Sequence, residues 1–163
     1  MLGLRGRSAM IALALATMVA GAPFATLLAQ ESYLGTWKVT SAVVAPWVDK
    51  GSKPDQKEMR FLVGKTVTMK VNEITGPPAF ACKEPNYQLS NFTADMLFQG
   101  AFGEMHDNDK SVDPYQLAAT VGFQGASWTV LVTGCENEID WHFVDEKTVA
   151  VGLNDYVYIL KKQ

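Results

Sequence analysis

Residues 138–161 read EIDWHFVDEKTVAVGLNDYVYILK, and this stretch carries the clearest strand pattern in the chain. Its β-branched and aromatic residues gather in segments that are typical of strands, over 138–144, 148–153 and 156–161. Asn154-Asp155 has the residue types of a two-residue hairpin turn. The stretch therefore predicts consecutive antiparallel strands joined by short turns.

The lengths of these turns decide which side chains share a face of the hairpins. A turn at Asn154-Asp155 pairs apolar residues, namely Leu153 with Tyr156, Val151 with Tyr158 and Val149 with Leu160. A three-residue turn at 145–147 adds Trp141 and Phe143 to that face and directs the polar side chains away from it: Asp140, His142, Thr148 and Lys161. A two-residue turn would place Trp141 among Ala150 and Gly152 and bring His142 to the apolar side. We prefer the three-residue turn because it separates polar from apolar side chains better.

Alternation of polar and apolar residues continues along the rest of the chain. Residues 66–71 alternate cleanly, and further strand candidates cover 37–45, 79–83, 87–89, 98–102 and 127–133. One helix is predicted over 114–121, because Asp113 suits the N-cap, Pro114 the first helical position and Gly122 the residue past the end. Residues 93–96 suit one further helical turn, and residues 49–57 have the polar composition of a long loop.

A flat meander of this many strands would leave open edges and a bare apolar face. Closing the sheet into a barrel, or folding it into a sandwich, removes that problem. The sequence pattern does not separate the two solutions. It predicts an all-β domain of about eight antiparallel strands.

Two ends of the predicted sheet carry a recognisable pattern. Gly35-Thr36-Trp37 opens the first strand, Asn154-Asp155-Tyr156 marks the last hairpin, and Lys161 lies near the end of the last strand. In these residues the chain resembles the lipocalin and wider calycin superfamily. The resemblance implies a small antiparallel β-barrel, here with the one short helix predicted above, in which Trp37 packs at the base beneath Lys161 in a cation–π contact. Small exported inhibitors of proteases and lysozymes have similar disulfide-stapled barrels, so the resemblance admits them too.

The composition of the chain excludes several classes of protein. The chain has 163 residues, of which 48% are hydrophobic and 19% charged, and this excludes a wholly disordered or coiled-coil protein. The formal net charge is −3, and no basic stripe is visible, so a nucleic-acid partner is not expected.

The first residues have the pattern of a secretory signal peptide. Arg5 and Arg7 precede a short apolar run over 8–20, Pro23 breaks any helix, and Leu27-Leu28-Ala29 supplies a cleavage site before Gln30. The alternative is a membrane anchor, but the apolar run falls short of the ~20 residues that cross a bilayer. We therefore expect residues 1–29 to be removed and residues 30–163 to form a single β-barrel domain. It would be periplasmic or secreted, without stable membrane insertion.

Cys82 and Cys135 are the two cysteines of the chain. In an exported protein such a pair predicts a disulfide. It would stabilise the fold by about 4 kcal/mol, because closing a loop restricts the conformations of the unfolded chain. Free thiols or a catalytic cysteine are the alternatives, and the spacing does not suit a metal pair.

The residues that usually carry catalysis or bind metals form no convincing set. His142 and Asp140 are two residues apart on one strand face, which suits either a carboxylate-supported base or, as we prefer, a polar outer face. Residues Glu104, His106, Asp107 and Asp109 crowd one segment, but Val112 and Ala118 stand where a calcium loop needs Gly and Glu. We therefore expect no enzyme activity, no metal and no cofactor.

Aromatic residues carry the functional expectation. A ligand cavity inside a small barrel would be lined by large side chains, for which the candidates are Trp47, Met69, Trp128, Trp141, Tyr156 and Tyr158. Each of these also suits an ordinary core, except Trp47, which follows Pro46 at a predicted rim. The sequence predicts an exported protein that binds a small, mostly apolar ligand. The alternative is an inhibitor of a secreted hydrolase, a protease or lysozyme, that acts through loop 49–57 or 104–113; the acidic balance would suit a basic target.

Overall fold

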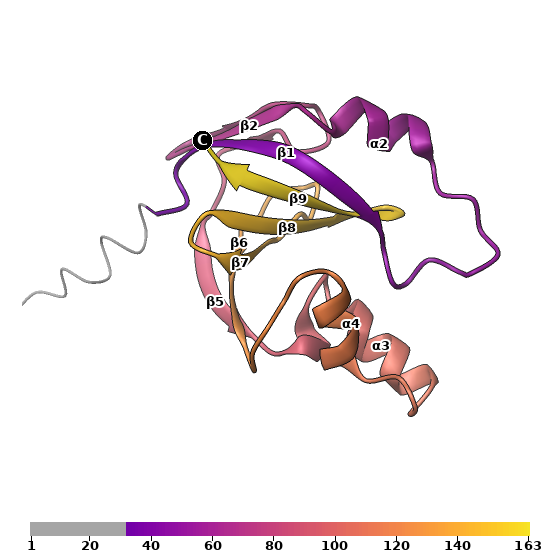
Figure 1. The fold of residues 1–163 in the computed structure, drawn as a ribbon. Coiled ribbons are helices and arrows are strands. Elements are labelled where there is room, and N and C mark those ends of the chain that lie inside the picture. Colours follow the sequence, from indigo (N-terminus) through magenta and orange to yellow (C-terminus); the bar gives the residue numbers. More distant parts are fainter. Residues whose placement is uncertain (1–31) are drawn as a thin grey trace, which may run out of the picture.

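Nine strands form one curled antiparallel sheet in the computed structural model, which describes residues 32–163 (Figure 1). The predicted signal peptide, 1–29, lies outside the described residues. The strands are β1 (Gly35–Val44), β2 (Thr66–Lys70), β3 (Glu73–Thr75), β4 (Cys82–Lys83), β5 (Gln88–Phe92), β6 (Trp128–Val132), β7 (Trp141–Asp145), β8 (Thr148–Leu153) and β9 (Tyr156–Lys162). Their order across the sheet is β4-β3-β2-β1-β9-β8-β7-β6-β5.

The register of the C-terminal hairpins confirms the predicted faces. In β8 and β9, Leu153 pairs with Tyr156, Val151 with Tyr158 and Val149 with Leu160. In β7 and β8, Phe143 pairs with Val149 and Asp145 with Thr148, so Val144 is an extra residue on β7. This β-bulge before a two-residue turn has the same effect on the faces as the three-residue turn. Trp141 and Phe143 therefore share the face of Val149.

The sheet curls into a half-barrel, and the closed calycin barrel is not confirmed. Within the described residues, β4 and β5 form the two edges and no ladder joins them. The predicted disulfide is present: Cys82 in β4 bonds to Cys135, which follows β6. It links the two ends of the sheet, together with a hydrogen bond from Asn86 N–H to the Thr133 carbonyl oxygen (2.7 Å) and one from the Tyr87 hydroxyl to the Lys70 carbonyl oxygen (2.9 Å).

Apolar side chains fill both faces of the sheet. The inner core lies within the curl and brings distant strands together; it includes Trp37, Met69, Phe80, Trp141 and Tyr158, all nearly inaccessible to solvent. The outer core lies on the other face beneath the helical segments of residues 94–120 and includes Phe98, Phe102, Phe123, Ala150 and Val157. Burial on both sides explains why the central strands β8 and β9 are apolar nearly throughout.

The helices correct the expectation of one short helix. The predicted helix is α4 (Pro114–Thr120), where the Asp113 side chain accepts a hydrogen bond from Tyr115 N–H, and the predicted turn is the 3-10 helix η1 (Ala94–Met96). Two others were not predicted. The segment 49–57 is a loop only as far as Asp55, whose side chain caps α2 (Gln56–Leu62). The segment 98–102 is not a strand, because residues 98–100 adopt positive φ and lead into α3 (Ala101–Asn108).

Trp37 lies in the inner core as predicted, but the cation above its ring is Lys162. The Lys162 Nζ is 5.5 Å from the ring centroid, and the Trp37 indole N–H donates to the Tyr33 carbonyl oxygen at 2.9 Å. Lys161 pairs with Lys38 and is exposed on the opposite face. Strand alternation is the reason, because Lys162 follows buried Leu160 by two residues.

None of the helices in residues 32–163 is long and apolar enough to cross a membrane.

Candidate functional site

The six predicted ligand-binding residues do not meet around one cavity. Met69, Trp141 and Tyr158 are at most 1% exposed, and Tyr156 is also buried, so these four fill the inner core. The ring of Phe80, from the turn before β4, packs on Trp141 at 5.8 Å and on Tyr158 at 6.2 Å between centroids. A ligand inside the curl would have to displace these rings.

Trp128 and Trp47 lie in two separate clefts at the surface. Trp128 lines a cleft of about 370 Å³ between the ends of β6 and β7, which we name the seam cleft. Trp47 lines another cleft, of about 420 Å³, beside α3, which we name the Trp47 cleft. The two clefts share no lining residue.

The seam cleft exists because β6 and β7 separate. Their ladder consists of the pairs Val130–His142 and Leu131–Trp141 and does not continue toward the start of β6. The bulge at Val144 bends β7 at this point, as an extra residue in one strand generally does. By contrast, β5 pairs with β6 along its whole length, from Gln88 to Phe92. The gap therefore opens within the sheet, next to its β5 edge.

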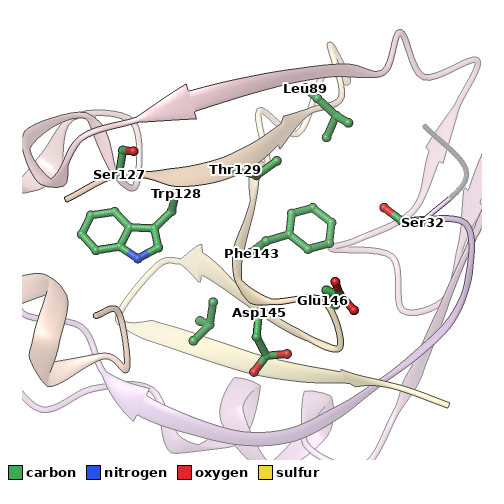
Figure 2. Close-up of a pocket in the computed structure, with 9 residues that line it drawn as sticks. Ser32, Leu89, Ser127, Trp128, Thr129, Phe143, Asp145 and Glu146 are labelled. Atoms are coloured by element: carbon green, nitrogen blue, oxygen red, sulfur yellow. The ribbon is translucent and has the colours of Figure 1, made fainter. Parts of the chain in front are cut away.

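Apolar side chains form the walls of the seam cleft. Trp128 and Phe143 supply aromatic rings from β6 and β7, and Leu89 and Val144 supply aliphatic groups (Figure 2). Leu89 is 39% exposed, which is high for a leucine on a strand. Such a surface loses unfavourable contact with water when an apolar molecule covers it.

Packing and hydrogen bonding fix the two aromatic rings in place. The Trp128 indole N–H donates to the Gln124 carbonyl oxygen at 3.2 Å, and its ring lies 5.3 Å from that of Phe123. The Phe143 ring meets that of Trp37 edge-on at 5.9 Å between centroids. Because these contacts fix the two rings, a ligand would not have to order them on binding.

Carboxylates are the ionisable groups at the rim of the seam cleft. Asp145 and Glu146 line it, and no lysine, arginine or histidine of the described chain does. The Asp145 carboxylate accepts a hydrogen bond from Lys147 N–H at 2.7 Å, which holds the turn between β7 and β8. This charge pattern favours a neutral or cationic ligand over an anionic one.

His142 corrects the expected polar outer face. It points away from the inner core as predicted, but the outer core covers it completely, and its two ring nitrogens have no hydrogen-bond partner. Phe98 lies over its ring at 4.5 Å between centroids. Burial lowers the pKa of His142 to about 3, so the ring is neutral in the folded protein.

The carboxylate-supported base that Asp140 and His142 suggested is not assembled either. Asp140 is half-buried; burial raises the pKa of its carboxyl group, and a hydrogen bond with Gln99 opposes that rise. The ring nitrogens of His142 have no hydrogen-bond partner, so Asp140 does not support them as a base.

The crowded segment 104–113 is helical in its first half, over residues 104–108. Glu104 and His106 lie in α3, where they do not share a face as they would on a strand. His106 Nδ1 is hydrogen-bonded with the Val112 carbonyl oxygen at 2.7 Å, and Asp107 forms an exposed ion pair with Lys110. In residues 32–163, no group of three or more His, Cys, Asp or Glu side chains is placed to hold a metal ion.

Among the residues that form the walls of the seam cleft, Trp128 is expected from the sequence and the others are not. Phe143 has the alternation of a core residue, and Leu89 lies in a short strand with no other distinguishing feature. The bulge at Val144 creates the cleft, and a bulge has no signature in an isolated sequence of this kind.

No family model, no curated protein and no solved structure matches this chain. The indications of function therefore come from its own clefts.

Proposed function

We propose that this protein binds a small, mostly apolar ligand in the seam cleft, as an exported binding protein. The observation that carries the proposal is the apolar cleft of about 370 Å³ walled by two rings that are already fixed, Trp128 and Phe143. Small-molecule sites are commonly of ~300 Å³ or more, apolar, and formed before the ligand arrives. The predicted signal peptide and the disulfide support export, where disulfides persist.

The proposal differs from the sequence expectation in where the ligand lies. The ligand does not enter the inner core, which is filled, but covers the gap between β6 and β7. The carboxylates of Asp145 and Glu146 lie at the rim, so we expect neutral or cationic apolar molecules to bind better than anionic ones.

The test is a fluorescence titration with N-phenyl-1-naphthylamine, a neutral apolar probe that brightens when it leaves water. Leu89→Ser removes part of the wall and is expected to weaken binding about tenfold, the equivalent of ~1.4 kcal/mol. Val71→Ser is the matched control, because Val71 is 75% exposed at the turn between β2 and β3 and does not line the cleft. Equal affinities of the wild type and the Leu89→Ser variant would reject the seam cleft as the site.

An inhibitor of a secreted protease or lysozyme is the second candidate. The observation in its favour is the segment before α2, which projects from the sheet and exposes residues 49–53 (Figure 1). The test measures the activity of a lysozyme and of a serine protease with the protein present, and compares the variant Lys50→Ala/Lys53→Ala. Inhibition by the wild type that the variant loses supports this function, and undiminished hydrolase activity removes it.

A further inference from the structure

The Trp47 cleft is built differently from the seam cleft. It lies between α3 and the turn that joins β8 to β9, and two aromatic residues, Trp47 and Phe98, line it; we call this aromatic part its floor. Polar side chains surround this floor, among them Gln99 and Glu104. An aromatic floor with a polar rim suits a ligand that carries charge or hydrogen-bonding groups.

The Trp47 ring is held at both ends. Its indole N–H donates to the Asn154 carbonyl oxygen at 3.0 Å, and its ring centroid lies 5.4 Å from that of Phe98 and 6.2 Å from that of Phe102. Both floor rings lie directly against β8: a Cβ atom at Gly152 would come within 3.0 Å of each ring. Glycine is therefore required under the floor.

The segment that carries Phe98 has an unusual backbone. Phe98 and Gln99 have φ values of +53° and +56°, and Gly100 follows at +81°. Bulky side chains rarely adopt this left-handed conformation, and such residues gather at sites that clamp ligands. The Gln99 side chain fixes the turn by donating to the carbonyl oxygen of Glu138, a residue that also has positive φ (+53°).

Helix α3 contributes one face to the cleft, and that face is acidic. Residues Ala101, Glu104, Met105 and Asn108 line the cleft at the spacing of one helical face. Glu104 is the only ionisable side chain among the described residues that line the cleft. The helix ends at Asn108, so the negative end of its dipole lies on the same side.

We propose that the Trp47 cleft binds a small organic ammonium ion, with the methylated or alkylated nitrogen over the Trp47 ring and Glu104 as its counter-ion. Tryptophan is the side chain that attracts such cations best, through the negative face of its ring. None of the described residues that line the cleft is basic, so none would repel the ligand. This site is independent of the proposed function, because it shares no residue with the seam cleft.

The experiment compares choline with 3,3-dimethyl-1-butanol, its neutral analogue of nearly the same shape, in ¹H–¹⁵N NMR titrations. The readout is the indole N–H resonance of Trp47, assigned with the variant Trp47→Phe. We expect choline to shift this resonance in a saturable manner, and the neutral analogue to bind at least tenfold more weakly. The same shift with both compounds would show an apolar groove and overturn the proposal, as would no shift with choline.

Two charge variants complete the test. Glu104→Gln keeps the shape of an exposed helical residue and is expected to weaken choline binding at least tenfold. Glu136→Gln removes an exposed carboxylate that lines neither cleft, so it changes the net charge equally and should leave choline binding unchanged. Unaltered binding in Glu104→Gln, or equal losses in both variants, would contradict a specific role for Glu104. If Glu104→Gln failed to fold, the comparison of choline with its neutral analogue on the wild type would still show whether the cleft selects for the positive charge.

Discussion

Replacing His142 by leucine is expected to stabilise the protein, although it removes a fully buried side chain. His142 is 0% exposed, and neither ring nitrogen has a hydrogen-bond partner. Its surroundings are apolar, with the rings of Phe98 and Phe92 at 4.5 and 6.4 Å between centroids and Ala150 paired with it across the ladder. Leucine has a similar volume and no polar atoms to bury.

The magnitude follows from two opposing effects. Burying an imidazole without hydrogen bonds destabilises the folded wild type by about 1–3 kcal/mol, and the leucine variant avoids this penalty. Repacking a different shape of similar volume costs up to ~1.5 kcal/mol. We therefore expect His142→Leu to raise the free energy of unfolding at pH 7 by about 1 kcal/mol.

Acid enlarges the difference between the two proteins. The pKa of His142 is about 3 in the folded protein, against an ordinary value of 6.5. Between these values the unfolded chain binds a proton that the folded chain does not, so stability falls as the pH drops through this window. The wild type should lose about 3 kcal/mol between pH 7 and pH 4 from this residue alone. His142→Leu should lack that contribution.

The assay is urea unfolding of both proteins at pH 7, 5.5 and 4, followed by tryptophan fluorescence and circular dichroism. The difference between the two proteins isolates His142 from the carboxylates, which titrate in both. A variant that is clearly less stable at pH 7, or one whose stability falls as steeply toward pH 4 as that of the wild type, would refute the reasoning.

Three further predictions concern the disulfide, the contact between Lys162 and Trp37, and the ion pairs of Glu73. Reduction of the Cys82–Cys135 disulfide should cost about 4 kcal/mol and lower the melting temperature strongly; a melting temperature unchanged by reductant would show that the bond adds nothing. Lys162→Ala should lower the free energy of unfolding by about 0.5–1 kcal/mol through loss of its cation–π contact, whereas Lys161→Ala should be neutral in the same unfolding assay; the reverse order would contradict the observed register. Glu73→Gln should remove a loss of stability that the wild type shows between pH 4.5 and 2, because hydrogen bonds and charges of Lys70 and Lys83 lower the pKa of Glu73 to about 2. The two lysines are exposed, so 1 M salt should shrink the difference, and a salt-independent difference would point to another cause.

The C-terminal hairpins were predictable from the sequence because turn chemistry and alternation agree there. Asn154-Asp155 sets the register of β8 and β9, and polarity chose the correct face for Trp141 and Phe143. The bulge at Val144 was not foreseen, but it leaves the faces unchanged. Alternation from Leu160 places Lys162, and not Lys161, on the face of Trp37, so the expectation of Lys161 conflicts with the strand pattern itself.

The closure of the sheet was not predictable in the same way. Alternation shows which face of a strand is buried, but not whether the two edges of a curled sheet meet. Here β4 has only two residues, and a disulfide with a few hydrogen bonds replaces the missing ladder. Alternation predicts a strand over 79–83, but only Cys82–Lys83 forms one, and the pattern does not reveal how short it is.

The second layer of helices explains the error at His142. A histidine between apolar residues on a strand suggests a solvent-exposed face, but the ring of Phe98, in the turn between η1 and α3, lies over it at 4.5 Å between centroids. Helix α3 contains Gly103, which disfavours helix in isolation; here it is needed, because a Cβ atom would approach the Asp95 carbonyl oxygen to 2.8 Å. Tertiary packing therefore overrides local propensity in this segment, and with it the prediction of a polar face.

The candidate sites were predictable only in part. Trp47 and Trp128 were expected to contact ligand, and both line clefts. The structure separates them, because Trp128 lines the cleft between β6 and β7 whereas Trp47 lies beside a helix that the sequence did not reveal. The other expected residues form the inner core, where large aromatic side chains serve packing.

The most direct test of the central claim is a map of where N-phenyl-1-naphthylamine binds, by ¹H–¹⁵N NMR on the protein of residues 30–163. Binding in the seam cleft predicts saturable shifts at Leu89, at Trp128 and Thr129, and at residues 143–146, with the inner core unchanged. Shifts centred on Trp37 and Tyr158 would instead place the ligand inside the curl, and the absence of saturable shifts would contradict ligand binding altogether.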